Sequence, residues 1–436
     1  MNKKQIENSI RGLLSLWVQE RNKEIKQQKK VRYAGPCLDA MDYDSLLSAL
    51  FNDWWSGGKF TLEAEQKLSR LGHRNHSLLC NSGSSANLLL ISAAKELYFK
   101  DGDKILTLAC GFPTTVNPII QNKLDPYFAD INLSDLSVSV DLFKCACKEG
   151  IKGAFIPHTL GFYGNINEIL DIARKYKVHV FFDCCDAYGT YYNELPIQSF
   201  GKAVTYSFYV AHHVTCGEGG GISCNDHNLF HTMRGMRNWG RYCASDDCCI
   251  RSMHPESFCP TAKLTKDSLL PDDYMVNYTY EWIGYNLKML DLQAAMLTSQ
   301  LDKLEDFNTI RRTNYENLYY NINWEGYNIK VWDLQDGVSP FAFPLILPDN
   351  KKYERKHLID HLRQNNIECR LMFGGNLARH PAYIKKFNFT NENVNLLPNS
   401  NKICKDGLML GVAPVNSESH INNIIANLDD FFEKWK

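Results

Sequence analysis

The chain has 436 residues, a formal net charge of −1, 44% apolar residues and 22% charged residues. This length suits a large domain with a smaller one, and the composition is that of an ordinary globular protein. The near-zero net charge excludes the basic surplus that nucleic-acid-binding proteins carry. We therefore expect no nucleic-acid partner.

The first 30 residues predict an amphipathic helix. They are charged throughout, and their apolar run LLSLWV, at 13–18, is too short to cross a bilayer. The run also lacks the cleavage site that ends a secretory signal. We expect residues 1–30 to form a helical extension of a cytoplasmic protein that has no membrane contact.

Residues from about 75 to 225 alternate between strand-like and helical runs. HSLLCNSGSSANLLLISAAKELYF reads as a strand, a turn of small residues and a helix, and GIKGAFIPHTLG, NINEILDIARKYK and VHVFFDCCDAYG continue as strand, helix and strand. This order is typical of an α/β protein with a mainly parallel sheet covered by helices. Functional sites in such sheets lie at the carboxyl ends of the strands.

The second half of the chain departs from this alternation. Residues from about 225 to 275 are loop-like, and 290–322 reads as one long helical stretch. A strand-like FAFPLILPDN, a helix near 353–365 and IECRLMF then predict a small α+β domain. We expect a large cofactor-binding domain at 31–290, with a cysteine loop at 240–275, and a small domain at 291–436.

Three short motifs have residue types that suit a cofactor. Gly83, Ser84 and Ser85 stand at a predicted helix start, where free N–H groups bind anions, although ordinary helix capping explains them equally well. Asp183 ends an apolar strand and can hold a ring nitrogen protonated, or cap a turn. Phe112 can cover a flat ring or pack in the core. Together these are the parts of a pyridoxal-phosphate site.

Two adjacent histidines, His212 and His213, lie between a strand-like run and the glycines of TYSFYVAHHVTCGEGGG. Loop ends of this kind often carry catalytic groups. The alternative is that one imidazole is packed and the other solvated.

Cysteines are unevenly spread along the chain. There are 15, and four of them lie within 17 residues: Cys243, Cys248, Cys249 and Cys259. Without a secretory signal, scattered cysteines are most simply small core residues, whereas a cluster indicates metal or redox chemistry. A zinc site and a loop without metal remain alternatives.

The motifs SGSSAN, GFPTTVNP, HTLG, DCCDAYG, SFYVAHH-T-GEGG and GYNLK--D-QAA occur in this order. The chain thereby resembles the DegT/DnrJ/EryC1/StrS superfamily of sugar aminotransferases from about residue 30 to 415. The resemblance implies a fold-type I pyridoxal-phosphate transferase, with a mainly parallel seven-stranded sheet and a small C-terminal α+β domain. It also implies a homodimer.

The common family pattern has a Schiff-base lysine where this chain has His212. An imidazole forms no such bond, but it moves protons near neutral pH. The chain thus resembles the 3-dehydrases of deoxysugar synthesis, and most closely the CDP-6-deoxy-4-keto-glucose 3-dehydrases, which use pyridoxamine phosphate and a [2Fe–2S] cluster. Their cysteine of CDALG and the next cysteine are separated by 57 residues, as are Cys185 and Cys243 here.

The resemblance implies a ligand set for that cluster: Cys185, Cys243, one of Cys248 and Cys249, and Cys259. This chain departs from the family pattern at Ser245, which stands where the family has the second cysteine of C-x-C. An NAD(P)H-dependent flavin reductase would supply the electrons.

The resemblance also assigns the other site residues. His212 would be the base, and Asp183 would hold the ring nitrogen; Asp186 and Tyr209 would tune His212 and the ring hydroxyl. Phe373 would border the sugar. Phosphate would be held by Ser84, Ser85 and Ser207, together with Asn286 of the partner subunit, while His213 has no mapped role.

The implied reaction is C3 deoxygenation of a nucleotide-linked 4-keto-6-deoxyhexose, most simply CDP-4-keto-6-deoxyglucose, in dideoxysugar and lipopolysaccharide O-antigen synthesis. Two alternatives remain. One is a cluster-free dehydratase of the GDP-4-keto-6-deoxymannose type, which regenerates its cofactor with glutamate. The other is an inactive homologue that binds a sugar nucleotide.

Overall fold

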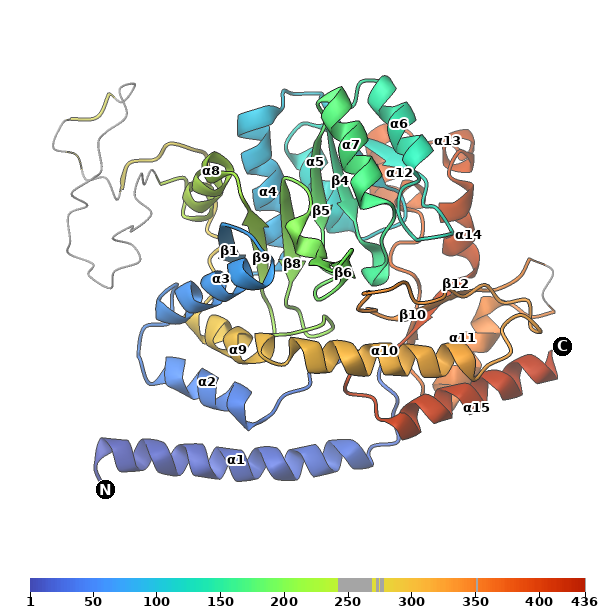
Figure 1. Ribbon diagram of the computed structural model, residues 1–436, viewed down its shortest axis with the longest axis horizontal. Coiled ribbons are helices and arrows are strands. Elements are labelled where there is room, and N and C mark those ends of the chain that lie inside the picture. The colour runs from blue at the N-terminus through green and yellow to red at the C-terminus, as the bar shows by residue number, and fades with distance from the viewer. Residues whose placement is uncertain (242–268, 272–273, 275–277, 350–351, 436) are drawn as a thin grey trace.

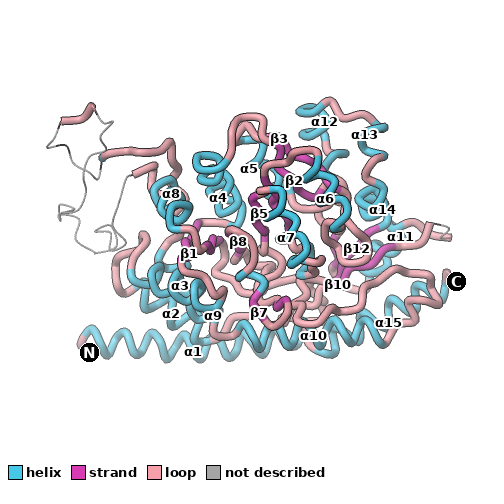
Figure 2. Tube along the Cα trace, turned by 45° about the horizontal axis from the view of Figure 1, so that its top comes forward, coloured by secondary structure: helices cyan, strands magenta, loops and turns pink. Residues whose placement is uncertain are grey.

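The computed structural model (Figure 1) describes the following residues: 1–241, 269–271, 274, 278–349 and 352–435. Their centre is a seven-stranded sheet with helices on both faces. A smaller sheet lies beside it toward the C-terminus, and a long N-terminal helix runs along one edge of the molecule. In Figure 2 the strands lie inside a shell of helices.

The large sheet has the strand order β1-β9-β8-β5-β4-β2-β3. Strand β9 is antiparallel to both of its neighbours. All the remaining neighbouring pairs, from β8 across to β3, are parallel. The mainly parallel seven-stranded sheet and the α/β class are therefore confirmed. The strands are β1 (His76–Cys80), β2 (Lys104–Leu108), β3 (Asp125–Ala129), β4 (Gly153–Pro157), β5 (His179–Asp183), β8 (Ala203–Ser207) and β9 (Gly220–Cys224).

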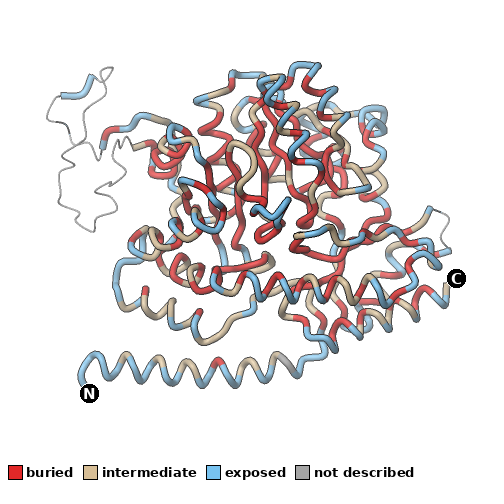
Figure 3. Tube along the Cα trace, viewed as in Figure 1, coloured by how far each residue is buried: buried red, intermediate tan, exposed pale blue. Residues whose placement is uncertain are grey.

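Alternate residues of the strands enter two different cores, because successive side chains point to opposite faces. In β5, Phe181 belongs to the same buried cluster as Leu89 of α4, whereas Phe182 belongs to the cluster that contains Ala173 of α7. Because both faces are covered, the inner strands read as continuous apolar runs. Figure 3 shows these inner strands largely buried, whereas the edge strand β3 is mostly half-buried. The helices around this sheet are α3 (Lys59–Leu71), α4 (Gly83–Tyr98), α5 (Pro113–Gln121), α6 (Val140–Lys148), α7 (Ile166–Tyr176) and α8 (His227–Arg237).

The C-terminal part has an antiparallel three-stranded sheet of order β10-β12-β11. Its strands are β10 (Phe343–Ile346), β11 (Cys369–Arg370) and β12 (Gly407–Leu410), and a hairpin of the large domain pairs β6 (Tyr191–Tyr192) with β7 (Leu195–Pro196). The helices here are α11 (Arg355–Gln364), α12 (Pro381–Phe387), α13 (Asn391–Asn395), α14 (Pro398–Asp406) and α15 (Glu418–Lys434). The predicted strand, helix and strand are thus present, while the exact domain boundaries stay predictions.

The N-terminal helix α1 (Lys3–Gln27) confirms the helix predicted for the first residues, and Asn2 caps it. It packs against α2 (Ala40–Leu50), but most of its surface is exposed (Figure 3). Arg21 fastens it by donating to the Leu38 carbonyl oxygen at 2.7 Å. Of the helices in the described residues, none is both long and apolar enough to cross a membrane.

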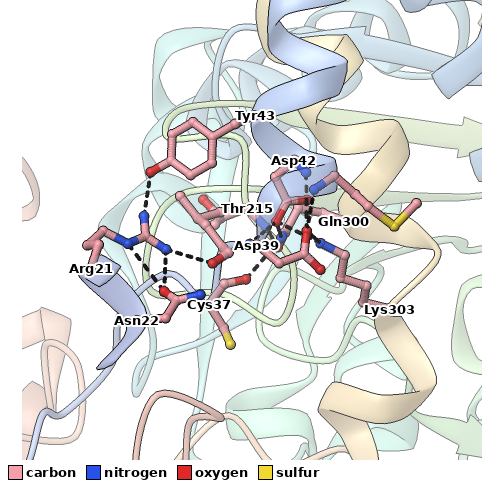
Figure 4. Close-up of polar contacts among 11 residues, drawn as sticks. Arg21, Asn22, Cys37, Asp39, Asp42, Tyr43, Thr215, Gln300 and Lys303 are labelled. Carbon is pink, nitrogen blue, oxygen red and sulfur yellow. Dashed lines mark hydrogen bonds and ion pairs between the residues drawn. The ribbon is translucent and has the colours of Figure 1, made fainter. Parts of the chain in front are cut away.

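The prediction of a single long helix at 290–322 is wrong, because the chain forms two helices, α9 (Asp291–Leu301) and α10 (Leu304–Tyr320), with a break between them. Lys303, at the break, reaches Asp39 at 2.6 Å and the fully buried Asp42 at 2.7 Å (Figure 4). These partners come from the other end of the chain, so helical periodicity alone does not reveal the break.

A buried carboxylate, that of Asp291, joins α9 to the start of α3. It accepts hydrogen bonds from the Thr61 N–H at 2.8 Å, the Thr61 hydroxyl at 2.7 Å and the Gly58 N–H at 3.0 Å. These N–H groups belong to the first turn of a helix and have no partner within it. A negative charge there is also favoured by the helix dipole.

We predict that Asp291→Ala lowers the free energy of unfolding by about 3 kcal/mol, because it leaves buried N–H groups unpaired. Urea unfolding followed by circular dichroism measures this loss. Asp302→Ala, which removes an exposed carboxylate paired with Lys67, is the control and should cost less than about 1 kcal/mol. Equal losses in the two variants would contradict the assignment.

Candidate active site

A cavity of about 520 Å³ lies where the strands of the large sheet end. Strand β5 ends at Asp183 and β8 ends at Ser207, and both residues line the cavity. Its lining brings together ten of the residues singled out in the sequence: Gly83, Ser84, Phe112, Asp183, Cys185, Asp186, Ser207, Tyr209, His212 and Phe373.

The carboxylate of Asp183 is held in one orientation. Its Oδ2 accepts from Thr115 Oγ1 at 2.7 Å and from Asn87 Nδ2 at 2.8 Å, and its Oδ1 accepts from the Cys185 N–H at 3.1 Å. Only 6% of Asp183 is exposed. A buried carboxylate with neutral donors around it is well suited to a cationic N–H, such as a protonated pyridine nitrogen.

Sequence reasoning missed Asn87 and Thr115, which fix this carboxylate. Both stand inside quoted motifs, SGSSAN and GFPTTVNP, at the starts of α4 and α5. The sequence motifs pointed to their neighbours, the glycine and serines of a helix start and the aromatic Phe112. Which side chains reach Asp183 depends instead on how two helices pack on the sheet. The sequence carried no signal for that contact beyond the motifs themselves.

The start of α4 forms the part of the cavity wall next to Asp183, since Asn87 of this helix donates to that carboxylate. Ser82 is the cap residue and accepts from the Ser85 N–H at 3.0 Å, so helix capping is present here, while anion binding stays a prediction. Gly83 and Ser84 face the cavity; Ser85 is outside its lining. A Cβ at Gly83 would lie 2.6 Å from Ser207 Cβ, so only glycine permits this close approach. Phosphate binding by Ser85 stays a prediction.

His212 follows β8 and its backbone is tied down. Its N–H donates to the Tyr209 carbonyl at 3.0 Å, and its own carbonyl accepts from Arg311 at 3.2 Å. The imidazole ring packs on the Phe341 ring, with centroids 5.2 Å apart, and its Nδ1 lies 3.7 Å from Asp186 Oδ1.

Burial makes both members of this pair neutral. It lowers the pKa of His212 to about 3, helped by the nearby Arg311 charge and opposed by the Cys185 backbone. Burial, together with the charge of Asp183, raises the pKa of Asp186 to about 8. Near pH 7 the imidazole is therefore unprotonated, whereas most of the Asp186 carboxyl still carries its proton.

His213 differs from its neighbour. It is buried outside the cavity lining, and its Nε2 lies 3.0 Å from the Ser339 carbonyl oxygen. Of the two imidazoles, His213 is therefore the packed one, whereas His212 lines the cavity with 14% of its side chain exposed. The burial of His213 and its contact with the Ser339 carbonyl oxygen support a structural role for this residue.

Three further predicted residues occupy the rim or lie outside it. Tyr209 is 45% exposed, and Phe373 has a positive φ of 47°. Asn286 lies outside the cavity lining, and its Oδ1 accepts from Lys288 at 2.8 Å. Its predicted role, a contact to the phosphate of a partner subunit, stays a prediction.

Of the predicted ligands of the iron–sulfur cluster, only Cys185 lies in the part of the chain that the structure describes. Cys185 lines the cavity, where its Sγ lies 3.2 Å from the Cβ position of Gly83. Burial and the Asp183 charge raise the pKa of its thiol well above the usual value. Within the described ranges, no group of three or more His, Cys, Asp or Glu side chains is placed to hold a metal ion. The other predicted ligands, Cys243, Cys248, Cys249 and Cys259, lie outside those ranges.

His158, in the HTLG motif, is a further buried histidine beside the cavity wall. Its ring stacks on Phe182 with centroids 4.7 Å apart, and neither ring nitrogen has a hydrogen-bond partner among the residues that the structure describes. Burial lowers its pKa to about 3. Below the ordinary histidine pKa of about 6.5, His158 is protonated in the unfolded chain but not in the folded one. The free energy of unfolding therefore falls as the pH is lowered.

We predict that His158 costs the wild-type protein about 2 kcal/mol of stability between pH 7 and pH 5. His158→Phe, which keeps the ring stack on Phe182, should therefore lose that much less stability over this interval. Urea unfolding at both pH values measures the difference. The exposed His380 provides the control: His380→Gln should keep the wild-type slope, and the same slope in His158→Phe would refute the prediction.

Comparison with known proteins gives a consistent result. Residues 36–429 match the model of the DegT/DnrJ/EryC1/StrS aminotransferase family. The chain is 33% identical over 407 residues to the lipopolysaccharide biosynthesis protein RfbH of Salmonella typhimurium, covering 92% of this chain and 91% of that protein. It is 32% identical to a dTDP-4-dehydro-2,6-dideoxy-D-glucose 3-dehydratase of Saccharopolyspora spinosa, covering 93% and 87% of the two chains.

Solved structures share the fold. The E. coli GDP-4-keto-6-deoxy-D-mannose-3-dehydratase with bound hydrated PLP matches with a TM-score of 0.80 and 25% sequence identity. The match covers 92% of this chain and 100% of that one. The fold-type I transferase fold expected from the motifs is thereby confirmed.

Proposed function

The chain belongs to the DegT/DnrJ/EryC1/StrS aminotransferase family, and on this premise we propose that it is a sugar-nucleotide 3-dehydratase that works with pyridoxamine phosphate. The observation that carries the proposal is that the described lining of the cavity contains His212 and no lysine. A lysine amine is what binds this kind of cofactor covalently. An imidazole instead leaves the cofactor free to carry its own amine to a keto sugar.

The residues of the cavity fit the cofactor. Asp183 would hold the ring nitrogen, Phe112 would cover the ring, and the phosphate would lie at the start of α4 near Gly83, Ser84 and Ser207. When bound, the cofactor supplies an amine and an electron sink. The protein contributes its orientation and a cavity that is closed on the side of the sheet.

His212 is the proposed general base. Its imidazole is neutral near pH 7 and lies inside the cavity, so a ring nitrogen is able to take a proton and return it. The protonated Asp186 carboxyl beside it is able to donate a hydrogen bond, and Arg311 holds the backbone of His212 in place. Tyr209 and Phe373 would border the sugar.

The substrate we propose is a nucleotide-linked 4-keto-6-deoxyhexose, with CDP as the nucleotide and a 4-keto-3,6-dideoxy sugar as the product. The likeness to a 3-dehydratase and to a lipopolysaccharide biosynthesis protein supports this substrate class. The choice of CDP rests on the sequence resemblance.

We further propose that Cys185 and three cysteines of the 240–275 loop bind a [2Fe–2S] cluster that receives electrons from a flavin reductase. Cys185 supports this because it lines the same cavity as His212 and Asp183. A cluster with this ligand would lie next to the cofactor, which is where electrons are needed. The thiol must lose its proton to bind iron.

We predict that His212→Ala lowers dehydration about 10²- to 10⁴-fold, which is the range of general acid–base catalysis. Its affinity for pyridoxamine phosphate should stay within a few-fold of wild type, as measured by absorbance titration. His212→Lys should retain pyridoxal phosphate through dialysis. His213→Asn is the neighbouring control and should keep most activity. Unchanged dehydration in His212→Ala would show that another group is the base.

Iron analysis tests the cluster. Wild-type protein purified without oxygen should contain about two irons per chain and absorb visible light. Cys185→Ala should lose both, whereas Cys184→Ala, which alters a buried core cysteine, should keep them. Iron-free wild-type protein that dehydrates with glutamate would favour the cluster-free dehydratase. Protein that binds no pyridoxamine phosphate would favour an inactive homologue.

A further inference from the structure

Arg370, on β11, is the one arginine or lysine among the described residues that line the active-site cavity. Its side chain is 54% exposed, so it stands at the rim rather than in the depth of the cavity. The opposite end holds Asp183 and the start of α4. The cavity is therefore polarised, with its cation at the entrance.

The guanidinium group of Arg370 is held in place but keeps donors free for a ligand. It lies over the Tyr33 ring, 5.3 Å from the centroid, and one N–H donates to the Cys369 carbonyl at 2.9 Å. Its nearest carboxylate oxygen, of Glu368, is 3.9 Å away. An arginine has five N–H donors in a rigid fork, and such a fork matches a phosphate.

Glu368 neutralises Arg370 only in part, because its carboxylate also pairs with Lys30. One of its oxygens lies 2.6 Å from Lys30 Nζ, and the other accepts from the Tyr33 N–H at 3.2 Å. These contacts keep the pKa of Glu368 low against the opposing effect of burial. One carboxylate thus faces two cations, Lys30 and Arg370, so the rim keeps a positive surplus.

A second cavity adjoins the rim and shares Arg370 with the first. It has a volume of about 370 Å³, and its lining adds the cations Lys30 and Arg363, the carboxylate Glu368 that pairs with Lys30, and the apolar Ile359 and Ile367. The volume is in the range of small-ligand sites. Cations with apolar side chains between them suit a ligand that has both phosphates and a flat base.

We propose that Arg370 binds the diphosphate of the sugar nucleotide, with the sugar in the active-site cavity and the nucleoside directed into the Lys30–Arg363 cavity. The assignment rests on the proposed function, which supplies the substrate class. An amino-donor carboxylate also pairs with arginine. Such a small anion would make no use of the second cavity, and for this reason we assign the site to a nucleotide.

Binding of nucleoside diphosphates without a sugar tests this directly. Isothermal titration of the protein loaded with pyridoxamine phosphate uses CDP, dTDP, GDP, pyrophosphate and glutamate as probes. We expect at least one nucleoside diphosphate to bind wild type, Arg370→Gln to weaken it tenfold or more, and Arg370→Lys to give an intermediate loss. Arg379→Gln, on an exposed side chain outside both cavities, should bind as wild type does.

Kinetics separates this site from the proposed reaction. If the protein dehydrates a sugar nucleotide, Arg370→Gln should raise KM tenfold or more with little change in kcat. Nucleotide binding that depends on Arg370 in a protein without dehydratase activity would overturn the proposed function and keep the subsite. Dehydration with an unchanged KM in Arg370→Gln would overturn the subsite alone.

Two further outcomes complete the test. Glutamate binding that is lost in Arg370→Gln, with nucleotide binding intact, would overturn the nucleotide assignment. Should Arg370→Gln fail to fold, Lys30→Gln and Arg363→Gln replace it, since each removes one cation from the second cavity. Nucleotide affinity unchanged in both would overturn the direction proposed for the nucleoside.

Discussion

The buried guanidinium group of Arg311 holds together three parts of the chain on which the active-site cavity depends. From α10 it donates to the carbonyl oxygens of His212 at 3.2 Å, Phe341 at 3.0 Å and Pro340 at 3.3 Å. Those carbonyls belong to the loop after β8 and to the segment that leads into β10. These hydrogen bonds from Nη1 and Nη2 offset the cost of burying a cation that is only 1% exposed, whereas its Nε has no hydrogen-bond partner among the described residues. The position of the proposed base therefore follows from the packing of a helix far along the sequence.

The charges around the cavity are few and far apart. Asp186 and His212 lose their charges to burial, which leaves Asp183 at the inner end and Arg370 at the rim. In the proposed complex, the negative Asp183 would face the positive pyridinium ring, and the positive Arg370 would face a negative phosphate. Fewer competing charges in a low-dielectric cavity make each remaining one a stronger determinant of orientation.

The sequence was sufficient for those features that depend on local order. Strand ends, small-residue turns and ordered motifs located Asp183, Gly83 and His212 and the α/β class, because each follows from a pattern within one segment. Contacts between distant segments were not accessible in this way. Thr115 reaches Asp183 only after two helices pack on the sheet, and Arg370 enters the cavity lining from the small sheet. The helix break at Lys303 depends on its ion pairs with carboxylates near residue 40.

Gln300 extends this dependence to the N-terminal segment. Its amide nitrogen donates to Asp42 at 2.9 Å and to the Cys37 carbonyl at 3.1 Å, while its oxygen accepts from the Thr215 N–H at 3.3 Å, three residues after His212 (Figure 4). An amide side chain suits this position because its nitrogen donates while its oxygen accepts. Gln300 therefore ties α2 and the segment before it to the loop that carries His212, so a change that removes the Gln300 amide or the Asp42 carboxylate would loosen both at once.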